Sequence, residues 1–203
     1  MAAAARTTGA SQTSRLRRWR DWLDSNLFAV SPPTVRPDRD RVALGLALAL
    51  AGVLVILLRL GWSKPLDSVW AEDGAVFLAG ALNDDLVGAV TTTYADYLHL
   101  VPRLLAELAA LAPLEWAPEL LSVLGATVVV LCAFIVWWAS AAHLPDPRLR
   151  GTLAAVVVLL PVVGYESLAN LAYVSWFMLF ASFWLLLWRP ASLWPRWTSD
   201  PGA

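Results

Sequence analysis

The chain has 203 residues, of which 59% are hydrophobic and 15% are charged, with a formal net charge of −1. Soluble domains carry about 45–50% apolar and about 25% charged residues, so this composition, with a mean hydropathy of +0.60, indicates an integral membrane protein. The single cysteine, Cys132, excludes an intrachain disulfide and a cysteine-based metal site, and two histidines exclude a histidine-rich metal cluster.

The first 41 residues divide into two segments. Residues 1–13 are rich in Ala, Ser and Thr without hydrophobic periodicity, so we expect them to be disordered. Residues 14–41 form a basic juxtamembrane segment in which apolar residues at helical spacing stand among arginines: Leu16, Trp19, Leu23 and Leu27. This pattern predicts an amphipathic helix on an anionic membrane surface. A solvated tail whose arginines orient the first span would explain the same pattern.

Four apolar stretches predict an all-α, polytopic membrane protein with a transmembrane domain over residues 42–188. A bilayer core of about 30 Å needs about 20 helical residues. The expected spans are residues 42–60, 120–142, 149–164 (bent at Pro161) and 171–188, followed by a tail at 189–203. The long loop between the first two spans, residues 61–118, holds two short apolar pieces that we expect to be interfacial helices, 75–82 and 104–111.

The basic residues predict the orientation of these spans, because cytoplasmic flanks carry an excess of Lys and Arg. The 61–118 loop has only Lys64 and Arg103 against nine acidic residues between Asp67 and Glu119. The arginines gather before the first span, in the turn after the second and after the fourth: Arg6, Arg15, Arg17, Arg18, Arg20, Arg36, Arg39, Arg41, Arg148, Arg150, Arg189 and Arg196. We therefore expect a multi-pass protein of the cell membrane with both termini in the cytoplasm and the acidic loop outside.

Adjacent carboxylates at Glu72 and Asp73, followed by Gly74, are the first candidate site. Two neighbouring carboxylates can bind a divalent cation such as Mg²⁺ or Mn²⁺ through oxygen. One of them can instead be a general base whose pKa is raised by the charge of the other. A solvated acidic loop, or acids that cap the 75–82 helix, would explain the pair equally well.

His99 and Arg103 are the second candidate site. Pro102 favours the first turn of a helix, so we expect the helix to start near Val101 and His99 to lie just before it. A cation beside a proton carrier suits an anionic, phosphate-bearing ligand. Alternatively, Arg103 pairs with Asp96 or Glu107.

Glu166 and Asn170 lie on the second outer corner, between the third and fourth spans. Polar groups near the bilayer are costly when unpaired, so they would either complete a pocket with the 61–118 loop or close a hydrogen-bonded turn. The sequence lacks the glycine-rich nucleotide-binding loops and the nucleophile elbow, which argues against ATP-driven and nicotinamide chemistry.

Three stretches carry a resemblance to a known family: Trp70-Ala-Glu-Asp-Gly-Ala-Val-Phe77, Tyr94-Ala-Asp-Tyr-Leu-His-Leu-Val-Pro-Arg103, and Gly164-Tyr-Glu166 with Asn170 and Trp176. Over residues 42–188 the chain resembles the N-terminal part of bacterial GT-C-type polytopic membrane glycosyltransferases. That resemblance implies a polyprenyl-phosphate-linked sugar donor and transfer on the outer face. It implies that Glu72 and Asp73 are the catalytic or metal-binding acids. The substrate-binding residues would be Tyr94, Tyr97, His99, Arg103, Glu166 and Asn170.

Two hypotheses of different class follow. The first is a hexosyl or pentosyl transferase, or the N-terminal fragment of one, with a second membrane chain as a candidate source of further spans. The second is a non-catalytic membrane protein that assists cell-envelope assembly, with the polar loop as a docking surface. The expected partners are the lipid bilayer and the lipid-linked sugar, and nucleic acid is not among them.

Overall fold

The computed structural model describes residues 6–28, 37–61, 66–159 and 168–189. Every named element in these ranges is helical, which confirms the all-α class, and Tyr94 and Tyr97 form an isolated β-bridge. The elements are α1 (Arg6–Asn26), α2 (Arg39–Arg59), the π-helix η1 (Asp73–Leu78), α4 (Ala79–Asn83), α5 (Leu86–Thr91), α6 (Leu100–Ala110), η2 (Leu114–Trp116), α7 (Ala117–Ala139), η3 (Ser140–Ala142), α8 (Pro147–Leu159) and α9 (Val174–Leu187).

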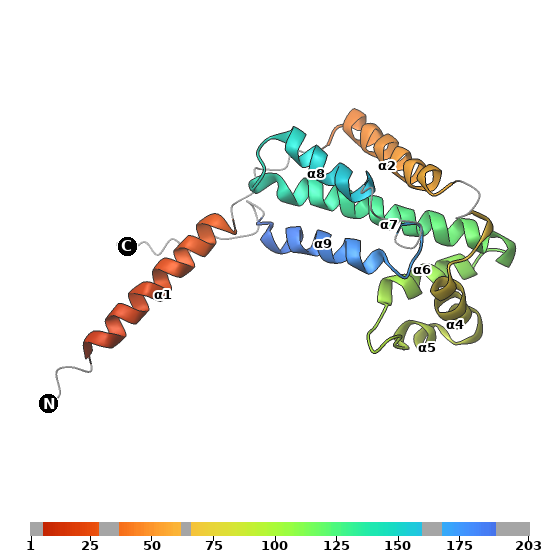
Figure 1. Cartoon of the computed structure of the whole chain (residues 1–203), viewed down its shortest axis with the longest axis horizontal. Coiled ribbons are helices and arrows are strands. Elements are labelled where there is room, and N and C mark those ends of the chain that lie inside the picture. The colour runs from red at the N-terminus through yellow and green to blue at the C-terminus, as the bar shows by residue number, and fades with distance from the viewer. Residues whose placement is uncertain (1–5, 29–36, 62–65, 160–167, 190–203) are drawn as a thin grey trace.

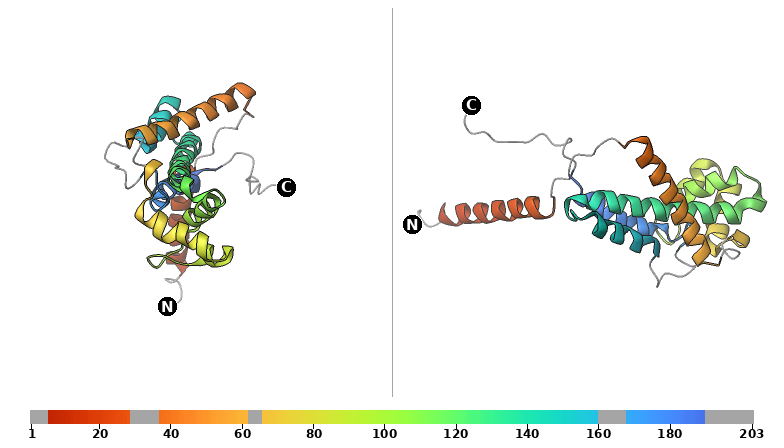
Figure 2. Two further views of the ribbon diagram at one scale, coloured as in Figure 1. Left: turned by 90° about the vertical axis from the view of Figure 1, so that its right-hand side faces the viewer. Right: turned by 90° about the horizontal axis from the view of Figure 1, so that it is seen from above.

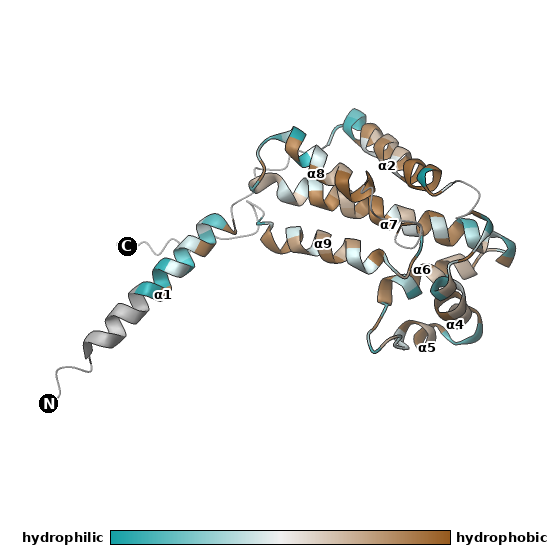
Figure 3. Cartoon of the chain, in the orientation of Figure 1, coloured by the Kyte–Doolittle hydropathy of each residue, from teal (hydrophilic) through white to brown (hydrophobic). Residues whose placement is uncertain are grey.

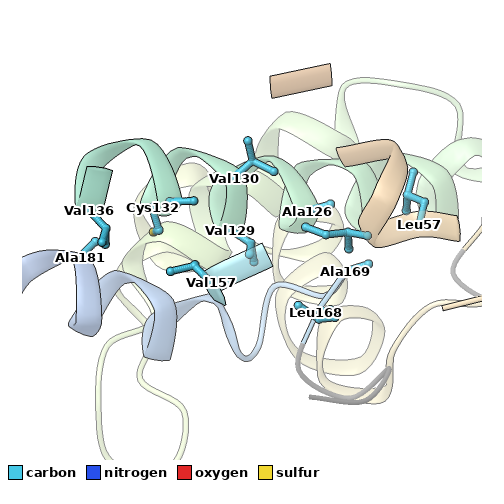
Figure 4. Close-up of a cluster of buried hydrophobic side chains, with 12 residues drawn as sticks. Leu57, Ala126, Val129, Val130, Cys132, Val136, Val157, Leu168, Ala169 and Ala181 are labelled. Atoms are coloured by element: carbon cyan, nitrogen blue, oxygen red, sulfur yellow. The ribbon is translucent and has the colours of Figure 1, made fainter. Parts of the chain in front are cut away.

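Helices α7, α8 and α9 lie side by side, and α2 crosses α7 and α8 obliquely; these four helices form the body of the molecule (Figures 1 and 2). Their shared core consists mainly of small and branched side chains, among them Val129 and Val136 of α7, Val157 of α8 and Ala181 of α9 (Figure 4). Small residues allow helix backbones to approach closely. Such packing explains how four helices without internal charges form one bundle.

Contacts near the helix ends fix the directions of the four helices. The Trp138 ring near the end of α7 lies 4.2 Å from the Trp188 ring just after α9, measured between centroids. Arg59, the last residue of α2, donates from Nη1 to the Val158 carbonyl near the end of α8, at 2.6 Å. The pair α7 and α9 therefore ends at one end of the bundle, and the pair α2 and α8 at the other.

Two helices are long and apolar enough to cross a membrane: Arg39–Arg59, with 21 residues, and Leu114–Ala142, with 29. They coincide with the first two predicted spans and suggest a membrane protein. Figure 3 shows that α2 is mostly hydrophobic. Many of its large apolar side chains are exposed, as expected of a helix that faces lipid rather than water: Val42, Leu44, Leu46, Leu48, Leu50, Leu54 and Leu58.

The other two predicted spans are only partly supported. The described part of α8 has 13 residues and α9 has 14, so each is about 20 Å long at about 1.5 Å per residue. The predicted third span continues over 160–164, and its bend at Pro161 lies outside the described residues. The described residues thus contain two candidate membrane-spanning helices, and the four transmembrane helices stay a prediction.

Two local predictions differ from the structure. We expected disorder up to residue 13 and a helix from 14, whereas α1 begins at Arg6. We did not predict α5, which is only 6 residues long. It exists because Asp85 caps it: the Asp85 carboxylate accepts a hydrogen bond from the Gly88 N–H at 2.6 Å.

Candidate functional site

The loop between the two candidate spans folds into a helical cap, residues 66–113, at the end of the bundle where α7 begins (Figure 1). Its two predicted interfacial helices exist, as η1 with α4 and as α6. Buried apolar residues bind the cap to the bundle: Phe77, Leu78, Ala106, Ala109, Ala117, Leu121 and Leu171. The cap carries most of the candidate site residues.

Asp73 connects the cap to the bundle. Its carboxylate is 1% exposed and accepts hydrogen bonds from the backbone N–H groups of Leu171 at 2.7 Å and Ala172 at 2.9 Å. Asp73 is also the first residue of the π-helix, a geometry often found at functional sites. The acid therefore does not cap its own helix and does not lie in a solvated loop. It accepts hydrogen bonds from N–H groups just before α9.

The pKa of Asp73 is raised from 3.8 to about 6. Burial is the main cause, and the negative charge of Glu72 adds to it, while the hydrogen bonds from Leu171 and Ala172 act in the opposite direction. A carboxyl group with a pKa near 6 can exchange a proton close to neutral pH. This is the property that a general base needs.

Asn170 completes the same corner. Its side-chain oxygen accepts a hydrogen bond from the Tyr173 N–H at 3.1 Å, so Asp73 and Asn170 together satisfy three consecutive N–H groups. The corner lies directly against α7 at Gly125, where an added Cβ would be 2.9 Å from the Asn170 backbone nitrogen. The hydrogen-bonded turn that we considered for Asn170 is present, and it also brings Asn170 next to Asp73.

His99 lies in a cluster of aromatic rings. Its side chain is 5% exposed, and its ring centroid is 4.2 Å from that of Tyr97, 5.3 Å from Phe77 and 5.6 Å from Tyr94. Burial lowers the pKa of His99, a hydrogen bond with the Tyr97 backbone raises it, and the charge of Arg103 lowers it again. Burial, the largest of these effects, favours the neutral ring, and Nδ1 is buried without a hydrogen-bond partner in the described structure.

A tight turn positions the two tyrosines. Tyr94 and Tyr97 exchange backbone hydrogen bonds of 3.1 and 3.3 Å, and the residues between them, Ala95 and Asp96, have φ angles of 51° and 66°. Positive φ at both central positions usually requires Gly or Asn, and alanine pays about 1–2 kcal/mol for it. Such backbone strain is common at ligand-binding sites.

Arg103 is one helical turn after His99 and is 2% exposed. Its Nη1 donates to the Ala89 carbonyl at 2.8 Å, its guanidinium carbon lies 5.6 Å from the centre of the Phe77 ring, and its Nε is buried without a partner in the described structure. The predicted pairing with Asp96 or Glu107 is absent, since the only ion pair among the described residues joins Arg41 to Asp38.

Replacing Arg103 with methionine is expected to lower the free energy of unfolding by about 1–3 kcal/mol, because the buried Ala89 carbonyl loses its donor. The matched control is Arg41→Met, at an exposed arginine whose ion pair contributes about 0–1 kcal/mol. Thermal unfolding of the detergent-solubilised protein measures both variants. Equal unfolding midpoints for the two variants would show that the contact between Arg103 and Ala89 does not stabilise the fold.

The remaining predicted site residues are less well defined by the geometry. Glu72 is half-buried, and its Oε2 accepts no hydrogen bond in the described structure. No three histidine, cysteine or carboxylate side chains within the described ranges are grouped so that they could hold a metal ion. Glu166 lies outside the described residues. The cation at Glu72 and Asp73 therefore stays a prediction.

The structure brings the predicted residues together in two adjacent groups, Asp73 with Asn170 and His99 with Arg103. Phe77 joins them, because it lies one turn after Asp73 and contacts both His99 and Arg103. Sequence reasoning missed Phe77, Ala89 and Gly125. The only signal for Phe77 was its spacing of four residues from Asp73, which places both on one helix face.

No family model, no curated protein and no solved structure matches this chain. The function is therefore argued from the site itself.

Proposed function

We propose that the chain forms the outer-face site of a GT-C-like membrane glycosyltransferase, complete or as its N-terminal part, which takes its sugar from a polyprenyl phosphate. One observation carries this proposal: Asp73, a buried carboxyl group whose pKa is raised to about 6, lies one helical turn from a cluster that contains a buried arginine. A proton acceptor and an anion-binding group are what this reaction needs.

In the proposed reaction Asp73 accepts the proton of an acceptor hydroxyl as its oxygen attacks the anomeric carbon of the donor. The bond between that carbon and the phosphate oxygen breaks, and the polyprenyl phosphate leaves with the electron pair. Arg103 and His99 stabilise the phosphate charge, and Tyr94 and Tyr97, whose rings pack against His99, contact the substrate beside it. Glu72, with Asp73, is the candidate ligand of a divalent cation.

The membrane orientation belongs to the same proposal. The helical cap lies at one end of the bundle and α1 near the other (Figure 1). With four membrane crossings, both termini are cytoplasmic and the cap, together with Glu166 and Asn170, is outside, where lipid-linked sugars would be used. The bilayer, the lipid-linked sugar and a second membrane chain are the proposed partners. A thiol label at Gly74→Cys, in a Cys132→Ala background, must then react from outside the cell.

Asp73→Asn is expected to reduce sugar transfer by about a hundredfold or more, since loss of a general base costs at least that factor. The assay supplies a panel of polyprenyl-phosphate-linked hexoses and pentoses to membranes that contain the protein in its full-length context. In the unmodified protein the rate should rise with pH through about 6, because only the ionised carboxylate accepts a proton.

Asp84→Asn is the matched control, because Asp84 is an exposed acid in the same cap. Its transfer rate should equal that of the unmodified protein. Normal transfer by Asp73→Asn, or a pH profile without a limb near 6, would remove Asp73 from the reaction.

A specific observation also favours the second hypothesis, a non-catalytic protein that assists envelope assembly. Both Asp73 oxygens accept backbone hydrogen bonds, so the carboxylate stabilises the corner before α9 whether or not it takes part in catalysis. In that case Asp73→Asn would reduce the recovery of folded protein and the capture of envelope partners. No member of the donor panel would be consumed.

A further inference from the structure

We propose that α1 binds the anionic lipid headgroups of the leaflet at which α2 begins and α7 ends. This inference needs only that α2 and α7 cross the membrane, and it is independent of sugar transfer. It concerns the one helix that leaves the bundle (Figures 1 and 2).

The composition of α1 suits a membrane surface. Leu16, Trp19 and Leu23 recur at three- and four-residue spacing and so share one side of the helix. Leu16 is 68% exposed and Trp19 is 64% exposed. Four exposed arginines lie next to them in the sequence: Arg15, Arg17, Arg18 and Arg20. Figure 3 shows the contrast between the hydrophilic α1 and the apolar bundle. A helix with this composition has no partner in the described structure that covers its apolar side.

Arginine and tryptophan side chains lie together on the exposed surface of α1. Arg15 and Arg18 lie beside Trp19 and Trp22, and the two indole rings meet edge to face with centroids 5.8 Å apart. Guanidinium groups bind phosphate oxygens, and indole rings partition to the headgroup level of a bilayer. This surface therefore presents the two chemistries that a phospholipid headgroup region requires.

The C-terminal end of α1 lies near the end of the bundle where α7 ends, and from there the helix extends away from the bundle (Figures 1 and 2). Just after its last turn, the Leu27 carbonyl lies 3.0 Å from Nε2 of His143, the first residue after the candidate span Leu114–Ala142. The other candidate span begins at Arg39, twelve residues after Leu27. Twelve residues can reach at most about 40 Å, so the start of this span lies within that distance of the end of α1. Both connections hold the C-terminal end of α1 near one leaflet, where basic side chains meet anionic lipid.

The test uses the full chain with Cys132→Ala and a spin label at Leu23→Cys, on the apolar side, or at Asp21→Cys, on the polar side. The protein is placed in nanodiscs of phosphatidylcholine, alone or mixed with phosphatidylglycerol. In the anionic nanodiscs we expect the label at position 23 to become accessible to oxygen and shielded from a water-soluble nickel complex. The label at position 21 should stay accessible to nickel.

A matched variant with Arg15, Arg17, Arg18 and Arg20 replaced by glutamine separates charge from apolar contact. Each arginine removed should weaken partitioning of α1 by about fivefold, and high salt should have the same effect as the variant. Two outcomes would overturn the proposal: a label at position 23 that stays in water in anionic nanodiscs, and equal immersion in neutral and anionic lipid.

Discussion

Asp73→Ala is expected to lower the free energy of unfolding by about 2–6 kcal/mol, because two buried backbone donors lose their acceptor at a cost of about 1–3 kcal/mol each. No water replaces the carboxylate easily, since the side chain is 1% exposed. Thermal unfolding of the solubilised protein, followed by tryptophan fluorescence, measures the loss. The control is Asp84→Ala, at an exposed acid, for which we expect a change of about 0.5 kcal/mol or less.

The same carboxyl group makes stability depend on pH, with a sign that follows from its pKa. The folded-state pKa, about 6, is above the ordinary value of 3.8, so the folded state holds the proton more tightly than the unfolded state does. The stabilisation is complete below pH 3.8 and is lost as the pH rises through 6, a change of about 3 kcal/mol. Asp73→Asn should remove this decline. A decline of unchanged size in that variant would assign it to another group.

Gly125→Ala is expected to lower the free energy of unfolding by about 3 kcal/mol. The added Cβ would lie 2.9 Å from the Asn170 nitrogen and 3.0 Å from its carbonyl carbon and oxygen, so backbone rather than a flexible side chain must shift. The shift would also move Leu171 and Ala172 away from Asp73. Thermal unfolding and the pH dependence described above measure the two consequences.

Gly45→Ala and Gly151→Ala are the matched controls, because an added Cβ at either helical position has no atom within 4 Å. Alanine is the better helix former, so these variants should be unchanged or more stable by up to about 1 kcal/mol. If Gly125→Ala were as stable as these two, the close approach of α7 to the Asn170 corner would be wrong.

Hydrophobic patterning predicted the parts of the fold that depend on local sequence. The two long apolar helices, the short helices of the cap and the start of α6 just after His99 follow from apolar run length and from the preference of Pro102 for a first turn. The same patterning predicted a helix at 171–188, within which α9 lies, and a helix from 149, of which the structure describes α8 as far as Leu159.

The hydrogen-bond partners of the site residues could not be predicted from the sequence. Asp73 was identified as one of two adjacent acids, but the sequence around it does not show that its carboxylate oxygens accept hydrogen bonds from the N–H groups of Leu171 and Ala172. A carboxylate partner was one of the two readings for Arg103. Its Nη1 instead donates to the carbonyl of Ala89, which belongs to a helix too short to predict. These contacts depend on tertiary packing, which local patterns do not encode.

The separation of 98 residues between Asp73 and Leu171 also sets an order of assembly. A ribosome that adds about 5–20 residues per second delivers the acid about 5–20 s before the N–H groups that will bind it. During that interval the carboxylate stays hydrated, with an ordinary acidity. The cap therefore matures only when α9 arrives, and a nascent chain stalled before that helix should expose the acid to water-soluble carbodiimide.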